Sequence, residues 1–521
     1  MLCFDVVQVL CDFCDLRTQI ALISSCKEFD ELKIRKLDCS NGIATRITQE
    51  IIQQKKFNRL QKLNAYNNSK ITSVNHLANT LIILNCEKDC GINQEGIDNL
   101  KVLQRLGANN NKKINSVNHL ANTLIMLNCG WDCGINQEGI NDLKVLRELH
   151  MSDNSKITSV NHLANTLIVL SSWNCGINQE GINDLKVLRE LDVYNNAKII
   201  SVNHLANTLI TLNCGLGSGI NQEGIKDLKI LKNLNASYNY NITSVNHLAN
   251  TLITLNCEER CGINQEGINE LKVLKVLYTS NNSKINSVNY LTNTLIELDC
   301  GENCGINQKG INDLKILQKL NVFDNCRITS VNHLANSLIE LKCSKNYYYN
   351  ENSCGINQEG IDGLKILQKL DASNNSKITS VNYLANTLIE LICTSNCGIN
   401  QKGINDLKIL QKLNVASNFR ITSVNHLMNT LIELNCGNYY AGSCGINQEG
   451  INNLNVLQKI DAYNNSAITS VNHLAYTLIE LDCRKSCGIN QEGIKDLKVL
   501  QKLDTYGNWN IFKSKIENLI A

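Results

Sequence analysis

Residues 295–334 of the chain are LIELDCGENCGINQKGINDLKILQKLNVFDNCRITSVNHL, and this stretch contains two copies of one apolar pattern. The first copy begins at Leu295 and is L-x2-L-x-C-x2-N-x2-I, and the second begins at Leu317 and is L-x2-L-x-V-x2-N-x2-I. Within the second copy, Leu320 and Val322 alternate with Asn321 and Phe323, so we predict a short strand with its Leu and Val side chains buried. Each copy therefore predicts one strand followed by a turn.

The same pattern continues along most of the chain. The tetrapeptide Gly-Ile-Asn-Gln occurs ten times, first at Gly91 and last at Gly488, at intervals of 42 to 50 residues. Each interval contains both copies, so the chain is an array of rungs of 21 to 22 residues. Rungs of the first kind are centred on Leu63, Leu106, Leu149, Leu191, Leu234, Leu277, Leu320, Leu370, Leu413, Ile460 and Leu503. Rungs of the second kind are centred on Leu84, Leu127, Leu170, Leu212, Leu255, Leu298, Leu341, Leu391, Leu434 and Leu481, and a worn copy at Leu37 raises the total to twenty-two.

This spacing resembles the leucine-rich repeat, L-x-x-L-x-L-x-x-N-x-L, from about Ile34 to Asn508. One departure is systematic, because two residues rather than one separate the Asn from the next aliphatic position. The resemblance implies an α/β solenoid with a concave parallel sheet and short convex helices, in which neighbouring rungs bury one another's faces. We therefore predict a helical segment over residues 1–33, the solenoid over 34–508 and a carboxy-terminal cap over 509–521.

Polar residues at fixed positions of the rung predict how its turns are held. An Asn follows every centre of the first kind by five residues, as Asn325 follows Leu320, and its amide can bond turning backbone groups in its own rung and the next. Asn307 is a predicted N-cap of a short helix over residues 307–317. In the other half-unit, the Ser of Thr-Ser-Val-Asn-His-Leu predicts a capped, shorter turn.

The composition excludes several classes of function. The chain has 521 residues, with 50 Lys+Arg against 48 Asp+Glu and a net charge of +2, which argues against binding nucleic acid or a membrane through bulk basic charge. There are 0 Pro residues, so no proline-rich linker separates domains. The amino terminus does not resemble a signal peptide, and no apolar run is long enough to cross a bilayer. These features predict an intracellular, cytoplasmic protein.

Cysteine and histidine recur with the repeat and invite a metal or disulfide interpretation. The chain has 24 Cys, and those at the position of Cys300 should point into the core, about 10 Å from their equivalents two rungs away for strands about 4.8 Å apart. That distance is too long for a disulfide or a shared metal ion, and the His of Val-Asn-His-Leu has the same spacing. No phosphate-binding or hydrolase motif occurs either. We therefore predict no metal, no cofactor and no enzymatic activity.

The first 33 residues do not fit the repeat and instead resemble the F-box, whose pattern is roughly E-[IL]-[LV]-x-x-I-[LF]-x-Y-L-D-L-x-[DT]-L-x-x-L-x-x-V-C-K-x-[FW]. The matching positions are Val6, Val7, Leu10, Phe13, Asp15, Leu16, Thr18, Leu22, Cys26, Lys27 and Phe29, with a helix break expected near Asp15. The usual Leu-Pro is replaced by Cys3-Phe4, and Cys14 and Gln19 stand where Leu is common. The resemblance implies docking on a Skp-type adaptor through Phe4, Val6, Val7, Leu10, Phe13 and Leu16.

An F-box followed by leucine-rich repeats is typical of a substrate receptor of a Skp-cullin-F-box ubiquitin ligase. The alternative is a stand-alone binding scaffold or inhibitor without a ligase link, in which residues 1–33 only cap the first rung. The richness in Asn, Ile and Lys is similar to expanded repeat families of giant DNA viruses and amoebae, which implies host-cell cytoplasm for a viral protein. Both hypotheses place a protein target on the concave face.

Large side chains in consecutive rungs mark a candidate target-binding patch. Trp131, His150, Trp173 and Tyr194 fall on predicted outward strand positions of four successive rungs, and strands about 4.8 Å apart should gather them. Aromatic residues are enriched in binding hot spots, although scattered surface aromatics are the plain alternative. Two insertions, with Tyr347, Tyr348 and Tyr349 in one and Tyr439 and Tyr440 in the other, predict a second candidate surface.

Overall fold

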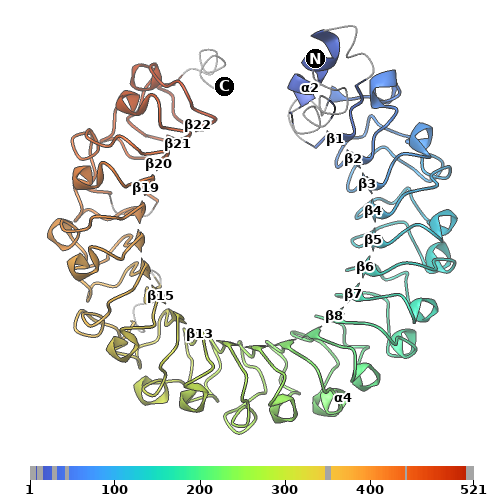
Figure 1. The fold of residues 1–521 in the computed structure, drawn as a ribbon, viewed down its shortest axis with the longest axis horizontal. Coiled ribbons are helices and arrows are strands. Elements are labelled where there is room, and N and C mark those ends of the chain that lie inside the picture. The colour runs from blue at the N-terminus through green and yellow to red at the C-terminus, as the bar shows by residue number, and fades with distance from the viewer. Residues whose placement is uncertain are drawn as a thin grey trace. The chain divides into compact units, whose positions relative to one another are not determined.

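The computed structural model describes residues 46–346, 354–439 and 443–511, together with Gln8, Cys14, residues 16–25 and residues 32–40. The chain divides into two compact units, Met1–Leu252 and Ile253–Ala521. Within each unit the strands lie along the inner edge and the helical turns, such as α4 (Gln222–Ile225), along the outer edge (Figure 1).

The described part of the first unit contains ten strands, and each pairs in parallel with the next along the chain. They are β1 (Lys36–Asp38), β2 (Lys62–Asn64), β3 (Ile83–Asn85), β4 (Arg105–Gly107), β5 (Met126–Asn128), β6 (Glu148–His150), β7 (Val169–Ser171), β8 (Glu190–Asp192), β9 (Thr211–Asn213) and β10 (Asn233–Asn235). Leu127, Leu149 and Leu170 stand side by side in the register of β5, β6 and β7.

The second unit has twelve strands in its described residues, again parallel and paired in chain order. They are β11 (Thr254–Asn256), β12 (Val276–Tyr278), β13 (Glu297–Asp299), β14 (Lys319–Asn321), β15 (Glu340–Lys342), β16 (Lys369–Asp371), β17 (Glu390–Ile392), β18 (Lys412–Asn414), β19 (Glu433–Asn435), β20 (Lys459–Asp461), β21 (Glu480–Asp482) and β22 (Lys502–Asp504). The central residue of every strand in both units is one of the predicted rung centres, so the predicted leucine-rich-repeat solenoid is confirmed.

Alternation along each strand builds the core. Leu320 and Val322 are 2% and 0% exposed, whereas Asn321 and Phe323 between and after them are only partly buried. Removing this apolar area from water stabilises each rung by roughly 25 cal/mol per Å². Since a three-residue strand alone is too short to be stable, each rung depends on its two neighbours.

The buried Asn column holds adjacent rungs together. The Asn154 amide donates to the backbone oxygens of Cys129 (2.8 Å) and Ile135 (3.0 Å) in the preceding rung, and its Oδ1 accepts from Lys156 N in its own rung (3.0 Å). The same three contacts recur at Asn325. The predicted ladder is therefore confirmed, and the neighbour that it bonds is the rung before it rather than the rung after.

The convex elements are shorter than predicted. Asn307 does cap a helix, since its side chain accepts from Gly310 N, but that helix is one 3₁₀ turn rather than a helix over residues 307–317. The turns of this half-unit are η6 (Glu138–Ile140), η8 (Glu180–Ile182), α4, η12 (Gln308–Gly310), η15 (Gln401–Gly403) and η18 (Glu492–Ile494), and α3 (Gln49–Ile52) and η3 (Lys55–Phe57) precede them.

The other half-unit also forms single 3₁₀ turns. They are η4 (Asn75–Leu77), η5 (Asn118–Leu120), η7 (Asn161–Leu163), η9 (Asn203–Leu205), η10 (Asn246–Leu248), η11 (Asn289–Leu291), η13 (Asn332–Leu334), η14 (Asn382–Leu384), η16 (Asn425–Leu427) and η17 (Asn472–Leu474). The preceding Ser contributes as predicted, because Ser159 Oγ accepts from Asn161 N at 3.3 Å, although Val160 occupies the N-cap.

Close packing of the rungs explains why these turns stay short. A Cβ on Gly139 would lie 2.1 Å from the backbone oxygen of Asn115, and one on Gly134 would lie 2.4 Å from that of Ile114. No side chain fits in that space, so the turn must carry Gly where it meets the neighbouring rung. A longer helix would separate the two backbones.

Little of the amino-terminal segment lies within the described residues. Helix α2 (Leu16–Ser25) begins directly after the break predicted near Asp15. The buried Gln8 side chain forms two hydrogen bonds with the backbone of Lys33, one through Nε2 and one through Oε1, each 2.9 Å. None of the helices in the described ranges combines the length and apolar character needed to cross a membrane.

Candidate protein-binding surface

Three of the four predicted target-binding residues come together in the first unit. The ring centroids of Trp131 and Trp173 are 5.9 Å apart with planes at 74°, and those of Trp173 and Tyr194 are 6.2 Å apart at 71°. Both pairs are edge-to-face contacts, the arrangement that the aromatic quadrupole favours. We call Trp131, Trp173 and Tyr194 the aromatic cluster.

The rung between the two tryptophans makes their contact possible. Trp131 follows β5 and Trp173 follows β7, so one rung, β6, separates them, and parallel strands two steps apart are about 10 Å apart. That rung presents the small Ser152 next to the cluster, and its backbone oxygen accepts from Trp131 N at 2.7 Å. The two indoles therefore approach each other across a rung with no large side chain.

His150 is not part of these ring contacts. It ends β6, in register with Asn128 and Ser171, and is partly buried. It therefore lies on a strand as predicted. The prediction of strand positions was wrong for the three aromatic residues, which lie in the turns that follow their strands. Within the described residues, the predicted patch consists of a ring cluster and a neighbouring histidine.

The aromatic cluster contains an unsatisfied polar group. Trp131 has φ 44°, in the left-handed region, but this position adopts a positive φ in other second-kind rungs as well, as at Lys88, Asn174 and Lys485. In addition, Trp173 Nε1 is buried and has no hydrogen-bond partner among the described residues, and Asp153 Oδ2 in the intervening rung is likewise unsatisfied. An unmade buried hydrogen bond costs about 1–3 kcal/mol.

These features make the aromatic cluster the best candidate for a binding surface. Trp131 is 52% exposed, so an apolar face is available to a partner. Buried polar atoms without a hydrogen-bond partner are rare, and each one calls for an explanation. A partner could cover the exposed indole of Trp131.

The predicted adaptor-binding residues are almost all outside the described part of the chain. Phe4, Val6, Val7, Leu10 and Phe13 lie there, and Leu16 is described only as the first residue of α2. The adaptor surface therefore stays a prediction.

The insertion predicted as a second surface is described in part. Tyr439 stacks on Tyr463 with centroids 4.7 Å apart and planes at 1°, and the guanidinium of Arg484 lies 5.2 Å from the Tyr463 ring centroid. The hydroxyl of Tyr439 donates to Asp461. Tyr347, Tyr348, Tyr349 and Tyr440 are outside the described residues.

Histidine contacts support the structural interpretation of the His column. His162 Nε2 lies 2.9 Å from the backbone oxygen of Ile140 one rung earlier, and the hydroxyl of Tyr290, which replaces His in its unit, donates to Ile268 O at 2.8 Å. Burial lowers the pKa of His162. In the part of the chain that the structure describes, no group of three His, Cys, Asp or Glu residues could hold a metal ion.

The inward cysteines are buried apolar residues. Cys129 and Cys133 are 0% and 1% exposed, and burial raises the pKa of the Cys133 thiol to about 11. The predicted separation of about 10 Å applies to cysteines two rungs apart. Within one rung two thiols can be close, because Cys393 forms a side-chain hydrogen bond with Cys397. Protonated, buried thiols of this kind are poor nucleophiles and poor metal ligands.

Sequence analysis missed one feature of the same rungs, a hollow on the edge where the strands begin. It contains Arg147 and Arg189, and its signal is the replacement of the usual Gln by Arg before β6 and β8.

Comparisons with solved structures find other repeat proteins. The functional domain of InlJ from Listeria monocytogenes, which includes a cysteine ladder, has 19% identity and a TM-score of 0.37 over 70% of this chain and 74% of that chain. The internalin InlF from Listeria monocytogenes has 18% identity and a TM-score of 0.30 over 64% and 81%. A leucine-rich-repeat protein from Leptospira interrogans has 22% identity and a TM-score of 0.32 over 85% and 95%. No protein-family model matches the chain, and no curated protein matches its sequence.

Proposed function

We propose that the chain is a protein-binding scaffold that holds its target against the aromatic cluster. The observation that carries this proposal is the set of edge-to-face contacts among Trp131, Trp173 and Tyr194, in which one ring is exposed and one buried N–H has no partner. Tryptophan and tyrosine at the centre of a surface are the commonest binding hot spots.

The chain offers a matched control for a test of this surface. W131A/W173A removes both indoles of the aromatic cluster, whereas W509A removes the third Trp, which is 86% exposed and belongs to a different unit. Proteins that co-purify with the wild-type chain are identified by mass spectrometry, and the purified candidate is titrated against all three proteins. We expect at least a tenfold loss of affinity for W131A/W173A alone, since hot-spot truncations cost about 2 kcal/mol or more. Equal affinities would overturn the proposal.

We propose further that the scaffold is a substrate receptor of a Skp-cullin-F-box type ubiquitin ligase in the cytoplasm, with residues 1–33 docking on a Skp-type adaptor. The F-box-like positions Val6, Val7, Leu10 and Phe13 support it, because their i, i+1, i+4, i+7 spacing predicts one apolar helix face. Gln8, which bonds Lys33, is outside this spacing, so attachment to the first rung does not require the apolar residues. The similarity in composition to repeat families of giant viruses and amoebae would place a viral protein in its host's cytoplasm.

The alternative is a scaffold or inhibitor without a ligase link, and the Gln8–Lys33 contact favours it, because a cap needs such an attachment. Pull-down with a purified Skp-type adaptor separates the two. The ligase proposal expects binding by the wild-type chain and none by L10D, with unchanged circular dichroism. Absence of binding by the wild-type chain, or a large loss of folded signal in L10D, would instead support the cap.

A further inference from the structure

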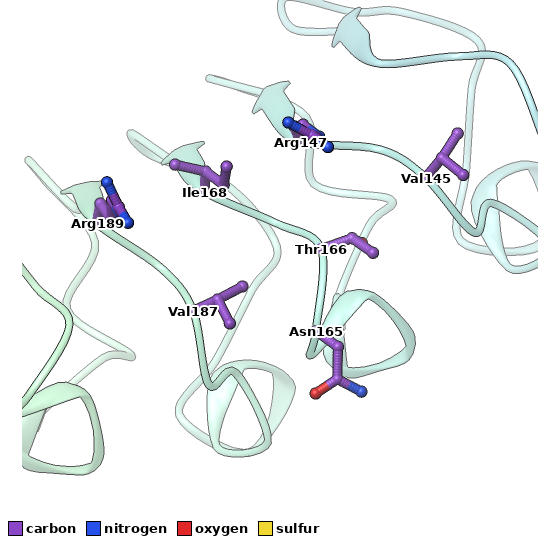
Figure 2. A pocket seen from close by; sticks show the side chains of 7 residues that line it. All are labelled: Val145, Arg147, Asn165, Thr166, Ile168, Val187 and Arg189. Atoms are coloured by element: carbon purple, nitrogen blue, oxygen red, sulfur yellow. The ribbon is translucent and has the colours of Figure 1, made fainter.

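A hollow of about 300 Å³ lies at the edge of the first unit where the strands begin (Figure 2). Its lining residues come from the segments before β6, β7 and β8 and are Val145, Arg147, Asn165, Thr166, Ile168, Val187 and Arg189. Figure 2 shows the two arginines on either side of Ile168, each at the start of its strand. A neighbouring hollow of about 400 Å³ shares Val145 and Arg147.

The positive charge at this edge is a local departure from the repeat. First-kind rungs carry Gln two residues before the strand centre, as at Gln61, Gln104 and Gln318. The next three first-kind rungs of the first unit after Gln104 carry Arg147, Arg189 and Lys232 instead. We call these three residues the cationic column.

The cationic column is available to a partner. All three side chains are exposed, and within the described residues none forms an ion pair, although Glu148 and Glu190 directly follow the arginines. In contrast, in the second unit the Lys directly before the centre of a first-kind rung pairs with a Glu of a neighbouring strand. Lys412, for example, lies 2.5 Å from Glu433. The cationic column therefore presents charge that the repeat does not neutralise.

The spacing of the cationic column selects the conformation of a bound chain. Its residues are two rungs apart, which is about 9.6 Å for strands about 4.8 Å apart. A polyproline II helix repeats every three residues and rises about 3.1 Å per residue, so residues i and i+3 face the same side about 9.3 Å apart. A β-strand places same-face residues about 6.6 Å or about 13 Å apart and does not fit.

We infer that the cationic column binds an acidic, extended segment of a protein partner in the polyproline II conformation, with carboxylates at positions i, i+3 and i+6. Arg147 and Arg189 each take one carboxylate through charge-assisted hydrogen bonds, and Lys232 takes the third. Apolar residues between the acids contact Val145, Ile168 and Val187 in the hollow. Charge complementarity and this apolar floor together define the ligand.

This inference rests on the proposed protein-binding function and names the chemistry of the partner. The aromatic cluster follows strands β5, β7 and β8, and the arginines precede β6 and β8, so the two features share the β8 rung and otherwise lie in neighbouring rungs. A strand of three residues separates the two edges, so one partner can reach both.

The test uses the full-length protein and two labelled peptides of equal composition, EPPEPPEPP and EEEPPPPPP. R147Q/R189Q introduces the Gln that equivalent rungs carry, so the fold has a native precedent for it. K315Q/K365Q removes the same charge from exposed positions of the second unit and is the control. A single-stranded oligothymidylate is the third probe.

We expect the wild-type chain to bind EPPEPPEPP more tightly than EEEPPPPPP, and R147Q/R189Q to weaken that binding about tenfold, with K315Q/K365Q unchanged. Equal affinity for both peptides, equal affinity of both variants, or tighter Arg-dependent binding of the oligonucleotide would overturn the inference. The W131A/W173A variant tests the proposed function separately. If W131A/W173A loses the target while the wild-type chain binds neither peptide, only the present inference is overturned. A chain whose target binds W131A/W173A normally would overturn the proposed function instead.

Discussion

The buried Asn column yields the sharpest prediction about stability. In Asn154→Ala the three hydrogen bonds to Cys129 O, Ile135 O and Lys156 N are lost, and Asn154 is only 2% exposed, so water does not replace them without opening the rung. At about 1 kcal/mol per bond, with a further cost for buried carbonyls left unsatisfied, the local free energy of unfolding should fall by about 3–4 kcal/mol.

The assay must report on individual rungs, because solenoid stability is a sum of nearest-neighbour contributions. Hydrogen-exchange mass spectrometry should show lost protection in peptides covering residues 126–160 and unchanged protection in those covering 460–511. Asn207→Ala is the control, because Asn207 is exposed and makes no side-chain hydrogen bond to the described residues. A change below about 1 kcal/mol in Asn154→Ala would refute the ladder as a source of stability.

Three further predictions follow from the same packing. Burial lowers the pKa of His162, so the unfolded state binds the proton more readily and stability should fall as pH drops below about 6.5. Denaturant titrations should show a weaker pH dependence of stability in His162→Tyr, a variant that copies the natural Tyr290 of another unit. Gly139→Ala should lower the melting temperature, because its Cβ would meet Asn115 O at 2.1 Å, whereas an Ala at the exposed Asn207 should not. Thiol counting in denaturant should give near-equal values with and without reductant, because buried thiols such as Cys133 resist oxidation, and many extra thiols after reduction would contradict this.

The strand centres were predictable because one period repeats along the chain, so an imperfect copy can be aligned with the better copies. Leu37 is a worn copy, yet its strand pairs with β2 in the predicted register, Leu37 beside Leu63. Helix length was not predictable, because the limit comes from the neighbouring backbone rather than from local propensity. A Cβ on Gly139 would lie 2.1 Å from the backbone oxygen of Asn115, 24 residues earlier, and no pattern within one rung encodes that distance.

The sequence predicted those parts of the candidate site whose geometry follows from the repeat. Rung spacing alone brings Trp173 near Tyr194, but the contact of Trp131 with Trp173 depends on the small Ser152 between them. All four residues were predicted on strand positions, but only His150 lies on a strand, because the strands are three residues long and end before the aromatic residues. The cationic column was missed because its signal is a substitution within aligned rungs, not a motif.

A nearly uniform solenoid can encode a specific surface only through its departures from the repeat. Most such departures cost little stability, since a surface substitution leaves the rung intact. Trp131 is one such departure, because the equivalent second-kind positions carry Lys88, Asn174 and Lys485, which share its positive φ but have no aromatic ring. Trp173 adds a buried N–H without a partner among the described residues. These two departures lie two rungs apart in the first unit, close to Arg147 and Arg189, and together they gather aromatic area at one place, which supports the proposed protein partner there.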